Sequence, residues 1–315
     1  MAELVVRFAG LELRNPFVLA SGIWGESGAS LAGAWKAGAG AVVTKSIGSS
    51  PRAGYPNPTI ESYDRWGMLN AMGLPNPGIA EYPKEIAAAI DSGATVIGSV
   101  FGGSPEEFAT LAERMAATGV AAVELNLSCP HAEGYGTEVG GTPEAVGEIV
   151  RAVCRSVRIP VIAKITPNTV DPAALAVAAE RAGARAVSAI NTVRGLAIDV
   201  RLRRPVLAHG LGGLSGPAIK PVGLAVVWQI SAQVSIPVIG IGGVTTAEDA
   251  LEYLMAGATA VQVGTAVAFE GVSIFGRLAR DLSTLLDQLR LPSAAASVGA
   301  ARAGPGTPRA SASGR

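Results

Sequence analysis

Eight short apolar segments, most followed by Gly or polar residues, recur along this 315-residue chain and constrain its fold more than any other feature. They read "FVLASG", "AVVTKS", "TVIGSV", "AAVELNLS", "PVIAKITPN", "AVSAINT", "PVIGIGG" and "AVQVGTA". Near-continuous apolar strands separated by amphipathic helices indicate a parallel sheet covered by helices. Eight such units predict an α/β protein with a (β/α)8 TIM barrel fold. A doubly wound open sheet is the alternative.

The segments between these strands have helical periodicity. In "SPEEFATLAERMAATG" the apolar residues recur every three or four positions, Ser104 is placed to cap the N-terminus, and Gly119 is placed to end the helix. The segment "TAEDALEYLMAG", from Thr246 to Gly257, has the same organisation. These boundaries support alternation of strand and helix along the whole chain.

Composition excludes several classes of partner. Lys plus Arg (25) equals Asp plus Glu (25), so no net charge attracts nucleic acid or an anionic membrane surface. Apolar runs are shorter than the roughly 18 residues that a spanning helix needs. The N-terminal "MAELVVRFAGLELRNP" lacks the pattern of a secretory signal, and two cysteines suit a reducing cytoplasm. Two cysteines also cannot hold a four-cysteine iron–sulfur cluster within the chain.

Three stretches depart from the repeat. Residues 47–78 and 193–216 are long, rich in Gly, Pro and Asn, and follow the second and sixth strands. Long loops on the active face of a barrel can cover its site. Residues 291–315 are Ala-, Gly-, Ser- and Pro-rich, so they are predicted to be disordered and to follow a single domain of residues 1–290.

Glycines close the last two strands. "GIGG" (Gly240 to Gly243) ends the seventh strand and "VGTA" (Val263 to Ala266) the eighth. Loops after strands seven and eight are the recurrent phosphate site of TIM barrels, because Gly lets backbone N–H groups approach an anion. Either motif alone could be a tight turn, but together they predict a phosphate that belongs to a substrate or to FMN.

Two lysines lie near strand ends. Lys45 and Lys164 would each direct a charge into the pocket, where a lysine forms a Schiff base, acts as a base, or holds negative charge on a cofactor. The alternative is that each pairs with a structural carboxylate. A reduced flavin is anionic near N1 and C2=O, and a lysine beside that edge would stabilise it, a role that fits Lys164.

Asparagines offer both hydrogen-bond donors and acceptors, as a planar ring with alternating N–H and C=O groups requires. Asn126 and Asn191, the latter followed by Thr192, occupy strand positions from which Asn is usually depleted. Asn70, taken alone, is more typical of a turn.

The two cysteines have different contexts. Cys154 lies within an amphipathic helix and is interpreted as apolar filler. Cys129 follows a strand end, stands between Ser128 and a proline, and is a candidate thiolate base. A metal site is not predicted, because His131 has no second Cys or His at usable spacing.

Nine motifs in this order resemble the class 1 dihydroorotate dehydrogenases: "ASG", "TKS", "NAMGLPNPG", "NLSCP", "KITPN", "AINT", "GGLSGPAIKP", "GIGG" and "VGTA". They extend over about residues 1–285. The segment from "INTVRG" to "AIKP" is most similar to class 1B, whose FMN barrel passes electrons to a second subunit with FAD and a [2Fe–2S] cluster and then to NAD. The resemblance implies oxidation of (S)-dihydroorotate to orotate in pyrimidine synthesis.

The same resemblance implies roles for individual residues. Cys129 would remove the C5 proton of the substrate while hydride passes from C6 to flavin N5. The residues implied in substrate binding are Lys45, Asn70, Met72, Gly73, Leu74, Asn126, Asn191 and Thr192. Those implied in binding one FMN per chain are Ala20, Ser21, Lys45, Ser46, Asn126, Lys164, Ile190, Gly216, Gly242, Gly243, Gly264 and Thr265. A homodimer within a heterotetramer with the electron-transfer subunit is the expected assembly.

One position departs from the family. Most members read "SCPN", whereas this chain has His131, as in the related dihydropyrimidine dehydrogenases that act on uracil and thymine. Those relatives carry an acidic residue where this chain has Met72, and an acidic residue there would repel the orotate carboxylate. Dihydroorotate is therefore favoured over dihydrouracil. A barrel subunit that only relays electrons, and a flavin-free phosphosugar isomerase or aldolase, are alternatives of other classes.

Overall fold

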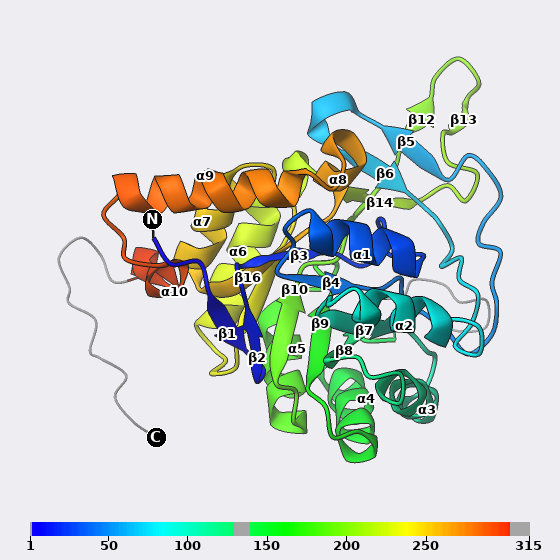
Figure 1. Cartoon of the computed structure of the whole chain (residues 1–315). Coiled ribbons are helices and arrows are strands. Elements are labelled where there is room, and N and C mark those ends of the chain that lie inside the picture. Colours follow the sequence, from blue (N-terminus) through cyan, green and yellow to red (C-terminus); the bar gives the residue numbers. More distant parts are fainter. Residues whose placement is uncertain (1, 129–138, 303–315) are drawn as a thin grey trace.

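The eight apolar segments form the strands of a closed parallel barrel (Figure 1). The computed structural model describes residues 2–128 and 139–302. In chain order the barrel strands are β3 (Phe17–Leu19), β4 (Ala41–Val43), β7 (Val96–Val100), β8 (Ala122–Asn126), β9 (Val161–Ile165), β10 (Ala186–Ala189), β15 (Val238–Ile241) and β16 (Ala258–Val263). The predicted barrel is confirmed, and the open doubly wound sheet is excluded because β16 pairs with β3 and closes the ring.

The strands are packed on both faces, as their composition requires. Every residue of β7 and β9 is buried, and so are the residues of β8 up to Leu125. Neighbouring strands are in parallel register, with Asn126 of β8 opposite Lys164 of β9. Because parallel strands all end at one rim, this register brings the polar residues that end β8 and β9 side by side.

Helices surround the barrel (Figure 1). They are α1 (Gly28–Lys36), α2 (Pro83–Asp91), α3 (Pro105–Ala116), α4 (Pro143–Ser156), α5 (Pro172–Ala182), α6 (Lys220–Ser231), α7 (Ala247–Ala256), α8 (Thr265–Glu270) and α9 (Ile274–Gln288). The predicted N-terminal caps are confirmed: the Ser104 side chain accepts from the Glu107 N–H, and Thr246 and Asp249 form a capping box that begins α7. α3 ends at Ala116, three residues before the predicted stop at Gly119. Gly257 ends α7 in the left-handed conformation.

The two long loops join into one antiparallel sheet of four strands, here called the roof sheet. Its strands are β5 (Ile60–Ser62) and β6 (Met68–Asn70), which flank the 3-10 turn η1 (Asp64–Trp66), with β11 (Val193–Gly195) and β14 (Gly212–Ser215). β6 pairs with β14, so segments more than 140 residues apart are bonded to one another. A hairpin of β12 (Ile198–Asp199) and β13 (Arg204–Pro205) extends from the second loop (Figure 1).

Other short elements lie outside the barrel strands and the roof sheet. β1 (Val6–Phe8) and β2 (Leu11–Leu13) form a hairpin, and η2 (Pro217–Ile219) leads into α6.

The C-terminal part of the described chain differs from expectation. The prediction of disorder from residue 291 is wrong for residues 291–302, which contain α10 (Ala294–Ser297) and η3 (Ala300–Arg302). Ala294 is fully buried, and its N–H donates to the Glu3 carbonyl, so burial and backbone pairing offset the weak local preference of this segment. Within the described residues, no helix is long and apolar enough to cross a membrane.

Candidate active site

An open cavity of about 1270 Å³ lies between the rim of the barrel and the roof sheet. It is lined by every predicted site residue that falls within the described ranges: Ala20, Ser21, Lys45, Ser46, Asn70, Met72, Gly73, Leu74, Asn126, Lys164, Ile190, Asn191, Thr192, Gly216, Gly242, Gly243, Gly264 and Thr265. The predicted base Cys129 and the divergent His131 lie outside the described residues. Residues scattered over most of the sequence thus face one space.

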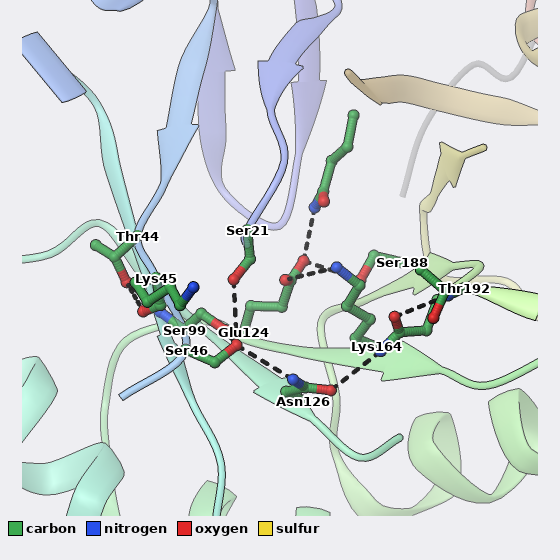
Figure 2. Close-up of polar contacts among 12 residues, drawn as sticks. Ser21, Thr44, Lys45, Ser46, Ser99, Glu124, Asn126, Lys164, Ser188 and Thr192 are labelled. Carbon is green, nitrogen blue, oxygen red and sulfur yellow. Dashed lines mark hydrogen bonds and ion pairs between the residues drawn. The ribbon is translucent and has the colours of Figure 1, made fainter. Parts of the chain in front are cut away.

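A chain of hydrogen bonds crosses the floor of this cavity (Figure 2). The Ser46 hydroxyl lies 3.1 Å from that of Ser21 and accepts from the Asn126 amide at 3.2 Å. Asn191 donates its amide N–H to Asn126 Oδ1 at 3.2 Å, and its own Oδ1 accepts from the Thr192 backbone N–H at 2.8 Å. These bonds fix the orientation of both amides, and each amide retains a second N–H for another partner.

The two lysines are buried and line the cavity, each beside a carboxylate. Lys45 Nζ lies 3.4 Å from Glu26 Oε1, and Lys164 Nζ lies 3.7 Å from Glu124 Oε1. Glu26 is exposed, whereas Glu124 is fully buried. Each lysine therefore pairs with a carboxylate and also lines the cavity. The pairing does not exclude a ligand-binding role for either lysine.

Glu124 is a functional candidate that the sequence predictions omit. Its Oε2 accepts from Ser188 Oγ of β10 at 2.9 Å and from Gln262 Nε2 of β16 at 2.6 Å, while Oε1 faces Lys164 (Figure 2). Among the described residues, buried side-chain atoms without a hydrogen-bond partner are Glu124 Oε1, Gln262 Oε1 and Ser128 Oγ. The available signal was a polar residue in the middle of three apolar strand segments, "AAVELNLS", "AVSAINT" and "AVQVGTA".

The roof sheet supplies the opposite wall. Asn70 is the last residue of β6 and donates its amide N–H to the Gly213 carbonyl at 3.2 Å, so its interpretation as a turn residue is wrong. Leu74 has a positive φ of 56°, a backbone conformation that residues other than Gly seldom adopt. The rings of Tyr55 and His209 stack with centroids 3.9 Å apart and join the two loops at the cavity.

Side chains of α7 form hydrogen bonds with the glycine loop after β15. Tyr253 donates its hydroxyl proton to the Gly242 carbonyl at 2.8 Å. Asp249 Oδ2 accepts the backbone N–H groups of Thr245 (2.9 Å) and Thr246 (2.8 Å), and Oδ1 accepts from Lys220 Nζ at 2.7 Å. Burial alone would raise the pKa of Asp249, but these hydrogen bonds lower it below its usual range.

The remaining polar candidates have simpler explanations. Cys154 lies in α4, partly buried against the core, and burial raises the pKa of its thiol, which disfavours the reactive thiolate. Within the described ranges, no three His, Cys, Asp or Glu side chains are placed to hold a metal ion. Among the described residues, the polar groups that line the cavity include amides, hydroxyls, two lysines and the ionisable side chains of Glu26, Arg194 and His209.

Comparison with known proteins identifies the family of this chain. Residues 3–286 match the dihydroorotate dehydrogenase family. The chain is 47% identical over 293 residues to the "Dihydroorotate dehydrogenase B (NAD(+)), catalytic subunit" of Methanocaldococcus jannaschii, covering 91% of this chain and 95% of that protein. Proteins of the same name from Pyrococcus abyssi (50% identical; 90% and 94% covered) and Thermoplasma acidophilum (47%; 96% and 99%) are also similar. The chain belongs to the dihydroorotate dehydrogenase family, as its motifs and its barrel both indicate.

Proposed function

We propose that this chain binds FMN and oxidises (S)-dihydroorotate to orotate in pyrimidine synthesis. The observation that carries the proposal is the single cavity in which a glycine cradle, a buried lysine and a floor of oriented amides meet. Relatives named as NAD(+)-linked dihydroorotate dehydrogenase B catalytic subunits, about half identical over nearly the whole chain, support it.

The residues that line the cavity fit FMN. A Cβ added at Gly264 would meet only Ala20 and Ile23 within 4 Å, and all three residues line the cavity, so the side chain would project into it. Gly242 and Gly243 both line the cavity and have positive φ, a backbone conformation that Gly adopts readily. These glycines would hold the phosphate of FMN. Lys164 would lie beside the edge of the flavin ring, at N1 and C2=O, that becomes anionic on reduction. When bound, FMN supplies the two-electron acceptor for the oxidation.

The substrate ring would lie over the amide floor. Asn126 and Asn191 present oriented donors and acceptors to a planar ring that carries N–H and C=O groups. Lys45 would pair with the substrate carboxylate. Met72 follows β6 and lines the cavity, and it is neutral where an acidic residue would repel that carboxylate. This favours dihydroorotate over dihydrouracil.

Cys129 would be the base that removes the C5 proton. Its neighbour Ser128 lines the cavity and is 95% buried, so the chain leaves β8 directly beside the proposed substrate position. A thiolate is the nucleophilic and basic form of cysteine, so its population sets the rate of proton removal.

If electrons leave this chain through an iron–sulfur cluster, another subunit must carry it, because two cysteines cannot hold a four-cysteine cluster. The resemblance to class 1B implies that an FAD and [2Fe–2S] subunit would receive the electrons and pass them to NAD. The term "catalytic subunit" in the names of the relatives supports this division of labour. A homodimer of this chain within a heterotetramer is the assembly we propose.

The test is anaerobic mixing of the purified flavoprotein with dihydroorotate, or separately with dihydrouracil, while flavin bleaching is recorded. We expect rapid bleaching by dihydroorotate alone. In Cys129→Ala the bleaching rate should fall by about two to four orders of magnitude, as expected for loss of a general base. Cys154→Ala is the matched control and should bleach at the wild-type rate.

Other outcomes identify the alternatives. Bleaching by dihydrouracil alone would assign the chain to dihydropyrimidine oxidation and give His131 the decisive role. A flavoprotein that neither compound bleaches would be an electron-relay subunit. A colourless protein without affinity for added FMN would point to a flavin-free isomerase or aldolase.

A further inference from the structure

A charged cluster lies inside the barrel, below the floor of the cavity. Glu124 has no solvent exposure, and its carboxylate lies beside Lys164 of β9 and Ser188 of β10 (Figure 2). Gln262 of β16 also contacts this carboxylate. Lys164 and Gln262 line the cavity, whereas Glu124 and Ser188 do not. The carboxylate is thus one residue removed from the ligand space, with the lysine between them.

The two oxygens of this carboxylate differ in their surroundings. Oε2 accepts hydrogen bonds from two neutral donors, the Ser188 hydroxyl at 2.9 Å and the Gln262 amide at 2.6 Å. Oε1 has no hydrogen-bond partner among the described residues and lies 3.7 Å from Lys164 Nζ, an ion-pair distance. The neutral donors hold the group in place, and its remaining oxygen opposes the charge of Lys164.

A charge buried in a protein interior is costly unless it has a partner, and Coulomb interactions there are stronger than in water. A bound group at the cavity therefore interacts with Lys164 and Glu124 together, as with a dipole whose positive end points toward it. The net field at that position is weaker than that of an unopposed lysine.

We propose that Glu124 is a positioning residue that sets the reduction potential of the bound flavin by offsetting the charge of Lys164. The inference rests on the proposed binding of FMN but not on the identity of the substrate. Reduced flavin is anionic, so a positive charge favours reduction and a negative charge opposes it. Glu124 keeps the potential lower than Lys164 alone would make it, and electrons then leave more readily for an acceptor of low potential.

The experiment measures the flavin midpoint potential of the intact, FMN-loaded protein against a reference dye, without any pyrimidine. In Glu124→Gln the ratio of reduced to oxidised flavin at a fixed potential should rise at least tenfold. For a two-electron couple, that ratio corresponds to an upward shift of about 30 mV or more. An unchanged or lower potential in a folded Glu124→Gln protein overturns the proposal.

Two further variants separate charge from hydrogen bonding. Ser188→Ala removes a donor to Glu124 without changing any charge, so the potential should stay near the wild-type value. The double variant Glu124→Gln with Gln262→Glu exchanges the two partners of the 2.6 Å hydrogen bond and restores one carboxylate, so it should return the potential toward wild type. If Ser188→Ala shifts the potential as much as Glu124→Gln, the proposal is wrong.

If Glu124→Gln does not fold, a second variant tests the same proposal. Gln262→Glu alone adds a second carboxylate to the cluster and should lower the potential, and an unchanged value would count against the proposal. Because no substrate is used, a wild-type protein that dihydroorotate fails to bleach refutes the proposed reaction and leaves this measurement intact.

Discussion

At the scale of single residues, the cavity depends on polar side chains placed where strands normally carry apolar ones. Asn126 ends β8, and its amide joins Ser46 on one side to Asn191 on the other. A buried amide costs free energy unless its hydrogen bonds are made. Here the neighbours satisfy part of its capacity and leave the rest for a ligand.

Asn126→Ala would break this chain in its middle. We expect the KM for dihydroorotate to rise at least tenfold, since Asn191 loses the acceptor that orients it and a substrate hydrogen bond is lost as well, together about 1.4 kcal/mol or more. Steady-state kinetics would show it. Ser99→Ala is the control, because Ser99 also bonds Ser46, at 2.9 Å, but lies outside the amide chain. An unaltered KM in Asn126→Ala would contradict the proposed substrate position.

At the scale of elements, α7 both covers the barrel and supports the glycine loop. The Asp249 carboxylate, in the first turn of the helix, accepts hydrogen bonds from the backbone N–H groups of Thr245 and Thr246. One turn later, the Tyr253 hydroxyl donates to the Gly242 carbonyl. Burial raises the pKa of the Tyr253 hydroxyl, so it remains a donor at all ordinary pH values. The helix therefore determines the shape of the proposed phosphate cradle.

Asp249→Asn should weaken this support, because Asn has one acceptor oxygen, so its amide N–H groups would face either Lys220 Nζ or the backbone N–H groups from which Asp249 now accepts. We expect a loss of about 2 kcal/mol in the free energy of unfolding at pH 7, typical of a charged hydrogen bond. The FMN dissociation constant should rise as well. Denaturant titration and flavin fluorescence would measure the two effects. Glu252→Gln removes the more exposed partner of Lys220 and should cost less than about 1 kcal/mol.

The same variant has a predictable pH dependence. The pKa of Asp249 lies below its usual value of 3.8 in the folded protein, so its stabilising contribution is complete above that value and is lost as the pH falls through the folded pKa. The stability difference between wild type and Asp249→Asn should therefore be constant near neutral pH and shrink below about pH 4. A difference that persists unchanged into acid would assign the effect to packing.

At the scale of the whole molecule, residues 291–302 connect the N-terminal segment to helices that cover the barrel. The Glu3 N–H donates to the Pro292 carbonyl, and the Gly299 N–H donates to the Leu254 carbonyl of α7. Arg302 stacks on the Trp228 ring and donates to Ser231 of α6. This segment thus connects the N-terminus with α6 and α7.

Two truncated chains would measure its contribution. We expect a chain that ends at residue 290 to melt about 3 °C below one that ends at residue 302, because the shorter chain loses the buried Ala294 and these backbone bonds, together worth about 2 kcal/mol. Thermal unfolding of both proteins with FMN present isolates the effect of residues 291–302. Equal melting temperatures would show that these contacts contribute no stability.

The sequence by itself determined the barrel strands, the N-terminal helix caps and the polar residues at the strand ends. These follow from local patterns, since parallel strands end at one rim whatever their order in the chain. The cavity residues of the long loops, such as Met72 and Gly216, were predicted only from the resemblance to a known family. Tertiary structure decided the rest. Gln262 meets Glu124 across 138 positions because the barrel closes, and β6 pairs with β14 because two long loops meet above the same rim. Residues 291–302 are ordered because a complete core is there to receive Ala294. Alternation along a strand tells which side chains point inward, but closure of the barrel decides which of them meet.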